Sequence, residues 1–121
     1  MRQMNLKSLP CSRFLVTTSV ASIQRKKIKA LGIESDFIKI IINDPFEKNQ
    51  SKLTIFRELL KSYSLNPVHT YVIGDNPESE IAGGNALGMN TVQMLRPGVM
   101  QGTTAKHHIS SFEELLPILC A

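Results

Sequence analysis

The sequence predicts an α/β fold in which a mainly parallel sheet is covered by helices on both faces. Strand-like segments alternate with segments of helical periodicity along nearly the whole chain, as in sheets built with helical crossovers. The segment 38–42 is rich in β-branched isoleucine, as expected for a strand covered on both faces. The chain of 121 residues suffices for one domain without a second lobe. Residues 1–12 are predicted as a helix tail or linker, and residues 13–121 as the core.

The first strand is predicted at residues 14–16, where a short apolar run ends in the hydroxyl groups of Thr17 and Thr18. A helix is expected next, over residues 20–31, because its apolar residues recur at near-helical spacing. Gly32 is the expected terminator of this helix, since glycine readily adopts the left-handed conformation that ends helices.

The second half begins with a polar loop over residues 44–50, after which Ser51 is expected to cap a helix. The predicted apolar face of that helix comprises Leu53, Phe56, Leu60 and Tyr63. Further strands are expected at residues 71–73, 90–94 and 107–109. Ser111 and Glu114 have the spacing of a capping box for the last helix.

The most informative stretch follows the strand at residues 71–73. Gly74 ends that strand, Asp75 comes directly after it, and Asn76 with Pro77 is typical of a helix start. Ligands of open α/β sheets bind outside the carboxyl ends of the strands, which makes Asp75 a candidate site residue. A purely structural role, in which Asp75 closes the turn, is the alternative.

Three polar groups are expected near the ends of strands or in the loops that follow them: the hydroxyl of Thr17, the ammonium of Lys48 or Lys52, and the carboxylate of Asp75. Together they suit phosphoryl transfer. The hydroxyl can bind phosphate oxygens, the lysine can offset negative charge, and the carboxylate can hold a magnesium ion.

Composition argues against several other classes of protein. The net charge is +4, but the one dense basic cluster, residues 25–29, has no interleaved aromatic side chains, so nucleic-acid binding is not expected. No apolar run is long enough for a membrane span or a signal peptide. Cys11 and Cys120 have no metal-type spacing and are interpreted as reduced thiols of a cytoplasmic protein.

The run GDNPESEIAGGNALGM, residues 74–89, resembles the fourth motif of the haloacid dehalogenase superfamily, most of whose members are phosphatases with a three-layer, Rossmann-like core. The strand that ends at Thr17 resembles the second motif. The resemblance implies that Asp75 is a catalytic magnesium ligand, supported by Glu80 and Asn76. It also implies that Thr17 and Thr18 bind phosphate.

The third motif of the superfamily is a lysine that contributes to catalysis and to phosphate binding. Lys52 is the first choice for this role because it leads directly into the helix that contains Ile55 and Phe56, and Lys48 is the alternative.

The sequence departs from the family in one respect. The family's nucleophile is an aspartate in an Asp-x-Asp motif, whereas the aspartates here are Asp36, Asp44 and Asp75, and none forms that motif. The resemblance therefore implies an incomplete core that lacks the central nucleophile strand, weak magnesium binding and no activity for the chain alone. Both a natural short protein and a truncated gene product are consistent with such an incomplete core.

The missing strand would lie between those at 14–17 and 71–73, so a homodimer or a strand-donating partner is expected to fill its place.

Three functions remain open. The first is a magnesium-dependent phosphohydrolase module acting on a phosphorylated small molecule. The second is a catalytically silent interaction or relic module of the same fold. The third is a receiver-like phosphoacceptor domain, which also uses Asp, Thr and Lys. That class places its phosphoacceptor before the other two residues, whereas Asp75 is the last of the three here.

Overall fold

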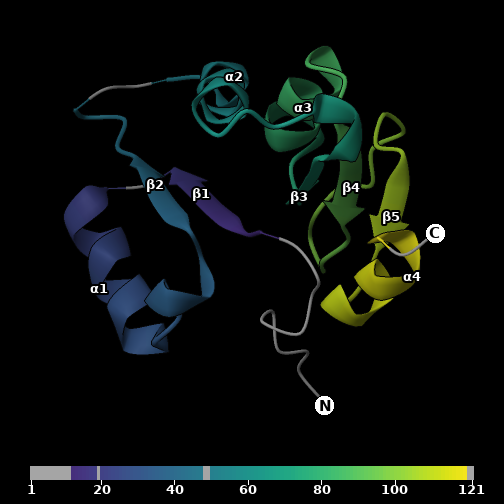
Figure 1. Cartoon of the computed structure of the whole chain (residues 1–121). Helices are drawn as coiled ribbons and strands as arrows, with labels where there is room; N and C mark the ends of the chain where they lie inside the picture. The colour runs from purple at the N-terminus through teal and green to yellow at the C-terminus, as the bar shows by residue number, and fades with distance from the viewer. Residues whose placement is uncertain (1–11, 19, 48–49, 120–121) are drawn as a thin grey trace. The chain divides into compact units, whose positions relative to one another are not determined.

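The computed structural model describes residues 12–18, 20–47 and 50–119 and shows an α/β protein whose strands pair in parallel (Figure 1). The chain divides into two compact units, Met1–Gln50 and Ser51–Ala121. Each unit has its own sheet. The described ranges leave out Lys48, both cysteines and nearly all of the predicted linker at residues 1–12.

Unit 1 is a two-stranded parallel sheet joined by a helix. Its elements are β1 (Phe14–Thr18), α1 (Ala21–Leu31), a 3₁₀ turn (Glu34–Asp36) and β2 (Lys39–Asn43). Thr17 lies opposite Ile42 in the ladder, and Thr18 opposite Asn43. Gly32 ends α1 as predicted, with a left-handed φ of 65° and its N–H bonded to the carbonyl groups of the last turn.

Unit 2 is built on a three-stranded parallel sheet in the order β3-β4-β5. The strands are β3 (Tyr71–Gly74), β4 (Asn90–Met94) and β5 (His107–Ile109). The helices are α2 (Lys52–Ser62), η3 (Pro67–His69), η4 (Pro77–Ile81), α3 (Ala82–Ala86), η5 (Phe112–Glu114) and α4 (Leu115–Leu119).

Two helix starts in unit 2 fall where the sequence predicts them. The Ser51 hydroxyl accepts the N–H of Thr54 at 3.2 Å and so caps α2. At the last helical segment, the Glu114 carboxylate accepts the N–H groups of Ser110 and Ser111, which is the glutamate half of the predicted capping box. The N–H of Glu114 bonds to the backbone carbonyl of Ser111. The side-chain bonds occupy backbone donors that have no partner within a helix.

The sheet of unit 2 buries different side chains on its two faces, because successive residues of a strand point to opposite sides. Val92 and Met94 pack with Ile109 and Leu115, the first residue of α4, in one hydrophobic cluster. On the other face α3 comes so close that a Cβ atom on Gly84 would lie 2.8 Å from Thr91 Cγ2 and 3.0 Å from Val72 Cγ2. Helices therefore cover both faces of this sheet.

The buried face of α2 differs from the predicted one. The buried residues are Ile55, Phe56 and Leu59, whereas Tyr63 is 39% exposed. Apolar residues occupy two adjacent stripes of this helix, and the periodicity alone does not choose between them. The choice follows from packing against α3, where Gly83 allows the first turn of α2 to approach its backbone.

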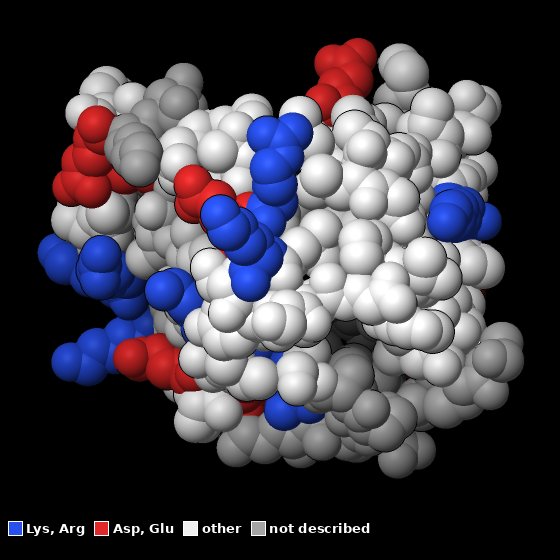
Figure 2. All heavy atoms as spheres, turned by 45° about the horizontal axis from the view of Figure 1, so that its top comes forward, with Lys and Arg blue, Asp and Glu red and all other residues white. Residues whose placement is uncertain are grey.

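None of the described helices has the length and hydrophobicity that crossing a membrane requires. On the face shown in Figure 2, basic side chains protrude singly or in small groups and acidic side chains lie among them. The basic cluster of residues 25–27 and 29 lies on α1, and its side chains are exposed.

Candidate active site

Strand β3 brings two acidic side chains to its carboxyl end. Asp75 follows Gly74 directly and is half-buried, as is Glu80. Glu80 folds back over the strand end, so that a Cβ atom on Gly74 would lie 2.7 Å from Glu80 Cβ and 3.0 Å from its Cδ. Only glycine leaves room for this arrangement, and it explains why the strand ends in a residue without a side chain.

The helix after Asp75 begins as the sequence predicts but with an unexpected geometry. Asn76 Oδ1 accepts the N–H of Glu78 at 2.9 Å, and Pro77 occupies the first helical position. The first five residues, Pro77–Ile81, form a wide π-helical turn that continues into α3. Such turns occur frequently at functional sites, and nothing in the residue pattern distinguishes them from an α-helical turn.

Lys52 is the first residue of α2 and is half-buried. Its backbone and Cβ atom lie against α3, where a Cβ atom on Gly83 would be 3.4 Å from Lys52 Cβ and 3.1 Å from the backbone nitrogen of Leu53. A lysine in the first turn of a helix is electrostatically unfavourable, because the N-terminal end of the helix dipole is positive. Helix stability therefore does not explain this lysine. The alternative, Lys48, lies outside the described residues.

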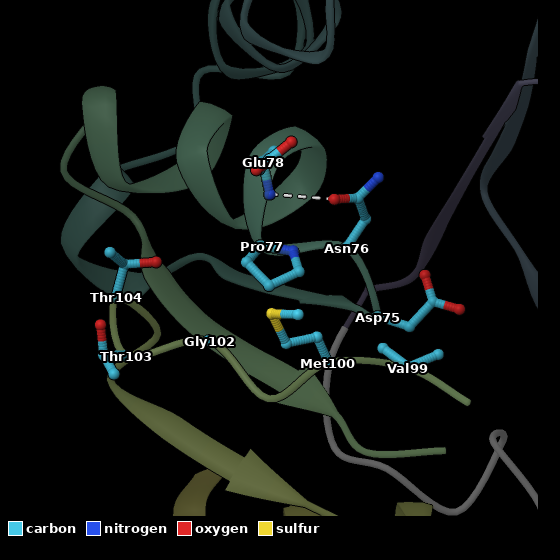
Figure 3. A pocket seen from close by; sticks show the side chains of 9 residues that line it. All are labelled: Asp75, Asn76, Pro77, Glu78, Val99, Met100, Gly102, Thr103 and Thr104. Carbon is cyan, nitrogen blue, oxygen red and sulfur yellow. Dashed lines mark hydrogen bonds between the residues drawn. The ribbon is translucent and has the colours of Figure 1, made fainter. Parts of the chain in front are cut away.

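An open pocket of about 660 Å³ adjoins Asp75 (Figure 3). One wall is the helix start, residues 75–78, and the other is the loop after β4, residues 99, 100 and 102–104. The carboxylate of Asp75 lies at the edge of this pocket and points away from Pro77 and Met100. The pocket therefore combines an apolar floor with carboxylate and threonine groups at its borders.

The two walls of the pocket are joined by Gln93, a residue that the sequence analysis did not single out. Its side chain is fully buried in β4, at 0% exposure. Its Nε2 donates to the carbonyl oxygens of Asp75, at 3.2 Å, and Met100, at 3.0 Å. Its Oε1 accepts the N–H of Gly102 at 2.9 Å. A long amide side chain inside a segment predicted to be a strand was the available signal.

The predicted phosphate-binding hydroxyls belong to unit 1. Thr17 Oγ1 accepts a hydrogen bond from Gln24 Nε2 at 2.7 Å, and Thr18 Oγ1 accepts one from Asn43 Nδ2 at 3.4 Å. These bonds use oxygen lone pairs, so they do not consume the hydroxyl hydrogens that would be donated to a phosphate. The described structure brings Asp75, Asn76 and Glu80 together within unit 2, and the juxtaposition of Thr17 or Thr18 with them stays a prediction.

Asp44 lies in the predicted polar loop, but it is not the solvated residue that such a loop suggests. It is buried, at 6% exposure, and its carboxylate accepts the N–H groups of Ala21 and Phe46, each at 2.8 Å. The hydrogen bond from the Ala21 N–H, followed by that from Phe46, lowers the pKa of Asp44 below its ordinary value. Because Ala21 is the first residue of α1, Asp44 serves as an anionic partner for that helix start.

Asp75 is a suitable ligand for a hard cation, which prefers carboxylate oxygens. In the part of the chain that the structure describes, however, no three His, Cys, Asp or Glu side chains form a group able to hold a metal ion. A magnesium ion requires about six oxygen ligands in octahedral geometry. The described residues thus supply part of the ligand set of a magnesium ion and do not complete it.

Residues 71–86 form the strand, glycine, aspartate and capped helix on which the resemblance to the haloacid dehalogenase superfamily mainly rests. The family model of haloacid dehalogenase-like hydrolases matches residues 4–94 of the 121. The chain belongs to the haloacid dehalogenase-like hydrolase family. This confirms the predicted family and the α/β fold, and it favours a hydrolase over a receiver-like domain.

Two phosphatases resemble this chain in sequence. A glyceraldehyde 3-phosphate phosphatase of Methanocaldococcus jannaschii is 27% identical over 119 residues, which cover 96% of this chain and 52% of that protein. A phosphoserine phosphatase of Thermus thermophilus is 27% identical over 86 residues, covering 69% of this chain and 34% of that protein. The chain thus spans about half or less of these relatives' length.

Solved structures of the family share the fold. The hydrolase YfnB of Bacillus subtilis, solved bound to magnesium, superposes with a TM-score of 0.73 at 24% identity. The match covers 91% of this chain and 50% of that one. At this level of identity the likeness establishes the fold, and the roles of the individual site residues remain predictions.

Proposed function

We propose that this chain carries the metal-binding and phosphate-binding part of a magnesium-dependent phosphohydrolase and does not itself supply the attacking group. The observation that carries the proposal is the end of β3. There a half-buried Asp75 follows a glycine that Glu80 overlies, and a capped helix begins at once. The family match and the two phosphatase relatives point to the same chemistry.

Each site residue has a proposed task. Asp75 would hold the magnesium ion, with Glu80 and Asn76 keeping the strand end and helix start in place. Thr17 and Thr18 would donate to phosphate oxygens, and Lys52, or Lys48, would offset the negative charge. When bound, the magnesium ion would stabilise negative charge that develops on the phosphoryl oxygens.

The attack on phosphorus is where the chain departs from its family. A carboxylate nucleophile forms a bond to phosphorus while the bond to the leaving alcohol breaks, and water then hydrolyses the acyl phosphate. No Asp-x-Asp occurs in the sequence, and the buried Asp44 is held by two backbone N–H groups of its own unit. The isolated chain is therefore proposed to bind magnesium weakly and to show no turnover.

A catalytically silent interaction module is the second candidate. Two observations favour it: the sequence lacks the nucleophile motif, and the described residues do not complete a metal site. It differs from the first candidate in that neither magnesium nor phosphate should bind. A homodimer, or a partner that donates a strand, is compatible with both candidates.

A magnesium titration followed by NMR separates the two candidates. The hydrolase module predicts magnesium-dependent shifts of the Asp75 and Asn76 amide signals that disappear in Asp75→Asn. They should persist in Glu58→Gln, a matched loss of one exposed carboxylate on α2 of the same unit. Absence of any response in the wild-type chain at millimolar magnesium contradicts the proposal and supports the silent module.

A phosphatase assay tests the missing nucleophile separately. With magnesium and a generic phosphate monoester, the isolated chain should release no more phosphate than Asp75→Ala does. Turnover well above that variant would show that the chain has an attacking group of its own. Turnover that appears only after addition of a strand-forming peptide ending in Asp-x-Asp would show directly that an outside segment completes the site.

A further inference from the structure

The loop after β4 and the strand end that carries Asp75 are held by one buried side chain. Gln93 makes hydrogen bonds to three backbone groups, which belong to Asp75, Met100 and Gly102. Its amide is completely removed from solvent, so these bonds form where no water competes for the donors and acceptors. Loss of such a side chain leaves backbone groups without partners, and that loss is costly inside a protein.

Two further contacts show that the loop is seated at Gly102 in one defined position. A Cβ atom on Gly102 would lie 2.7 Å from both Cβ and Cγ of Pro77, so the loop backbone rests directly on the first residue of the helix. From the other side, His108 Nε2 donates to the carbonyl oxygen of Gly102 at 2.7 Å. Gly102 is thus bonded through both of its backbone polar groups.

We infer that Gln93 is a positioning residue, which aligns Asp75 with the pocket wall formed by residues 99, 100 and 102–104. This inference rests on the proposed function of Asp75, because the alignment matters for catalysis only if Asp75 binds the metal. Gln93 fixes the carbonyl of Asp75 and thereby the peptide from which the carboxylate extends. The affinity of the site for magnesium should therefore depend on a side chain that does not contact the ion.

The two ends of the Gln93 amide bind different backbone groups, so substitutions can remove their hydrogen bonds separately. The nitrogen end holds the carbonyls of Asp75 and Met100, and the oxygen end holds Gly102. Gln93→Glu keeps the shape and an acceptor for Gly102, but it removes the amide hydrogens that bind the two carbonyls. Gln93→Leu removes both ends.

Thr91→Val is the matched control. Thr91 is equally buried in β4, at 0% exposure, and its hydroxyl bonds to Asn85 and to the N–H of Lys106. Neither of these hydrogen bonds involves Asp75, Met100 or Gly102, so loss of the hydroxyl weakens the same sheet without releasing the strand end. All variants are compared at equal distance below their melting temperatures.

The test combines NMR chemical shifts, amide hydrogen exchange and the magnesium titration. In Gln93→Leu we expect exchange at Gly102 to accelerate about tenfold, as for loss of one buried hydrogen bond, and the signals of residues 75–78 to shift. In Gln93→Glu the signals of residues 75–78 should shift while Gly102 stays protected. Magnesium should bind more weakly to both variants by several-fold, and Thr91→Val should match the wild-type chain in all three measurements.

The inference is overturned if the Gln93 variants lose only melting temperature, with shifts and exchange at these residues no different from those of Thr91→Val. It is also overturned if magnesium affinity is unchanged in both. A wild-type chain that does not respond to magnesium refutes the proposed function instead. In that case the shifts and the exchange at Gly102 still decide whether Gln93 aligns the two walls.

Discussion

The close packing of α3 against the sheet makes Gly84→Ala a demanding test of the fold around the site. The added methyl group would lie 2.8 Å from Thr91 Cγ2 and 3.0 Å from Val72 Cγ2, well inside normal contact distance. Thr91 and Val72 are buried, at 0% and 7% exposure, and both are β-branched, so neither can rotate away at low cost. Backbone movement of α3 away from β3 and β4 is the remaining response.

Two opposing effects determine the magnitude. Overpacking a core by one methyl group costs about 1–3 kcal/mol, and stiff neighbours place this site in the upper part of that range. Replacement of glycine by alanine within a helix gains about 1 kcal/mol. The net loss in the free energy of unfolding is therefore about 1–2 kcal/mol, or roughly 5–15 °C in melting temperature for a unit of this size.

Urea and thermal denaturation followed by circular dichroism measure this difference. Ala82→Gly, at an exposed position of the same helix, isolates the propensity effect and should cost about 1 kcal/mol with no steric contribution. An increase in stability for Gly84→Ala, which helix propensity alone predicts, would refute the close approach of α3 to the sheet.

Two further predictions concern helix starts. Asp44→Asn should lower the melting temperature at neutral pH. Because the folded-state pKa of Asp44 lies below its ordinary value of 3.8, the carboxylate stabilises the fold above that pH, and the difference between variant and wild type should shrink as the pH falls below it; a pH-independent difference would contradict this. Ser51→Ala should cost about 1 kcal/mol by urea denaturation through loss of the cap on α2, whereas Ser62→Ala, at the exposed end of the same helix, should cost much less.

Local signals in the sequence located the elements well. Gly32, Ser51, Asn76 with Pro77, and the Glu114 carboxylate of the predicted capping box all mark helix ends in the structure. Each of these signals acts through hydrogen bonds or backbone conformations within a few residues, so it needs no information from elsewhere in the chain.

Other features depended on partners that are distant in the sequence. Asp44 lies in the predicted polar loop, yet it is buried against the start of α1, 23 residues earlier. Gln93 acquires its significance only from the loop that folds back over it, and the buried stripe of α2 follows from its contact with α3. Helical periodicity reports that an apolar face exists, but it does not report which neighbour covers it.

The sequence by itself determined the family, the order of strands and helices, and the placement of Asp75 directly after a buried strand, because these depend on residue type and short spacing. Only the tertiary structure decided that Glu80 folds over Gly74 and that a buried glutamine ties Asp75 to the loop after β4. These contacts join residues from different elements. Their energies come from burial and steric fit, which exist only once the chain has brought those elements together.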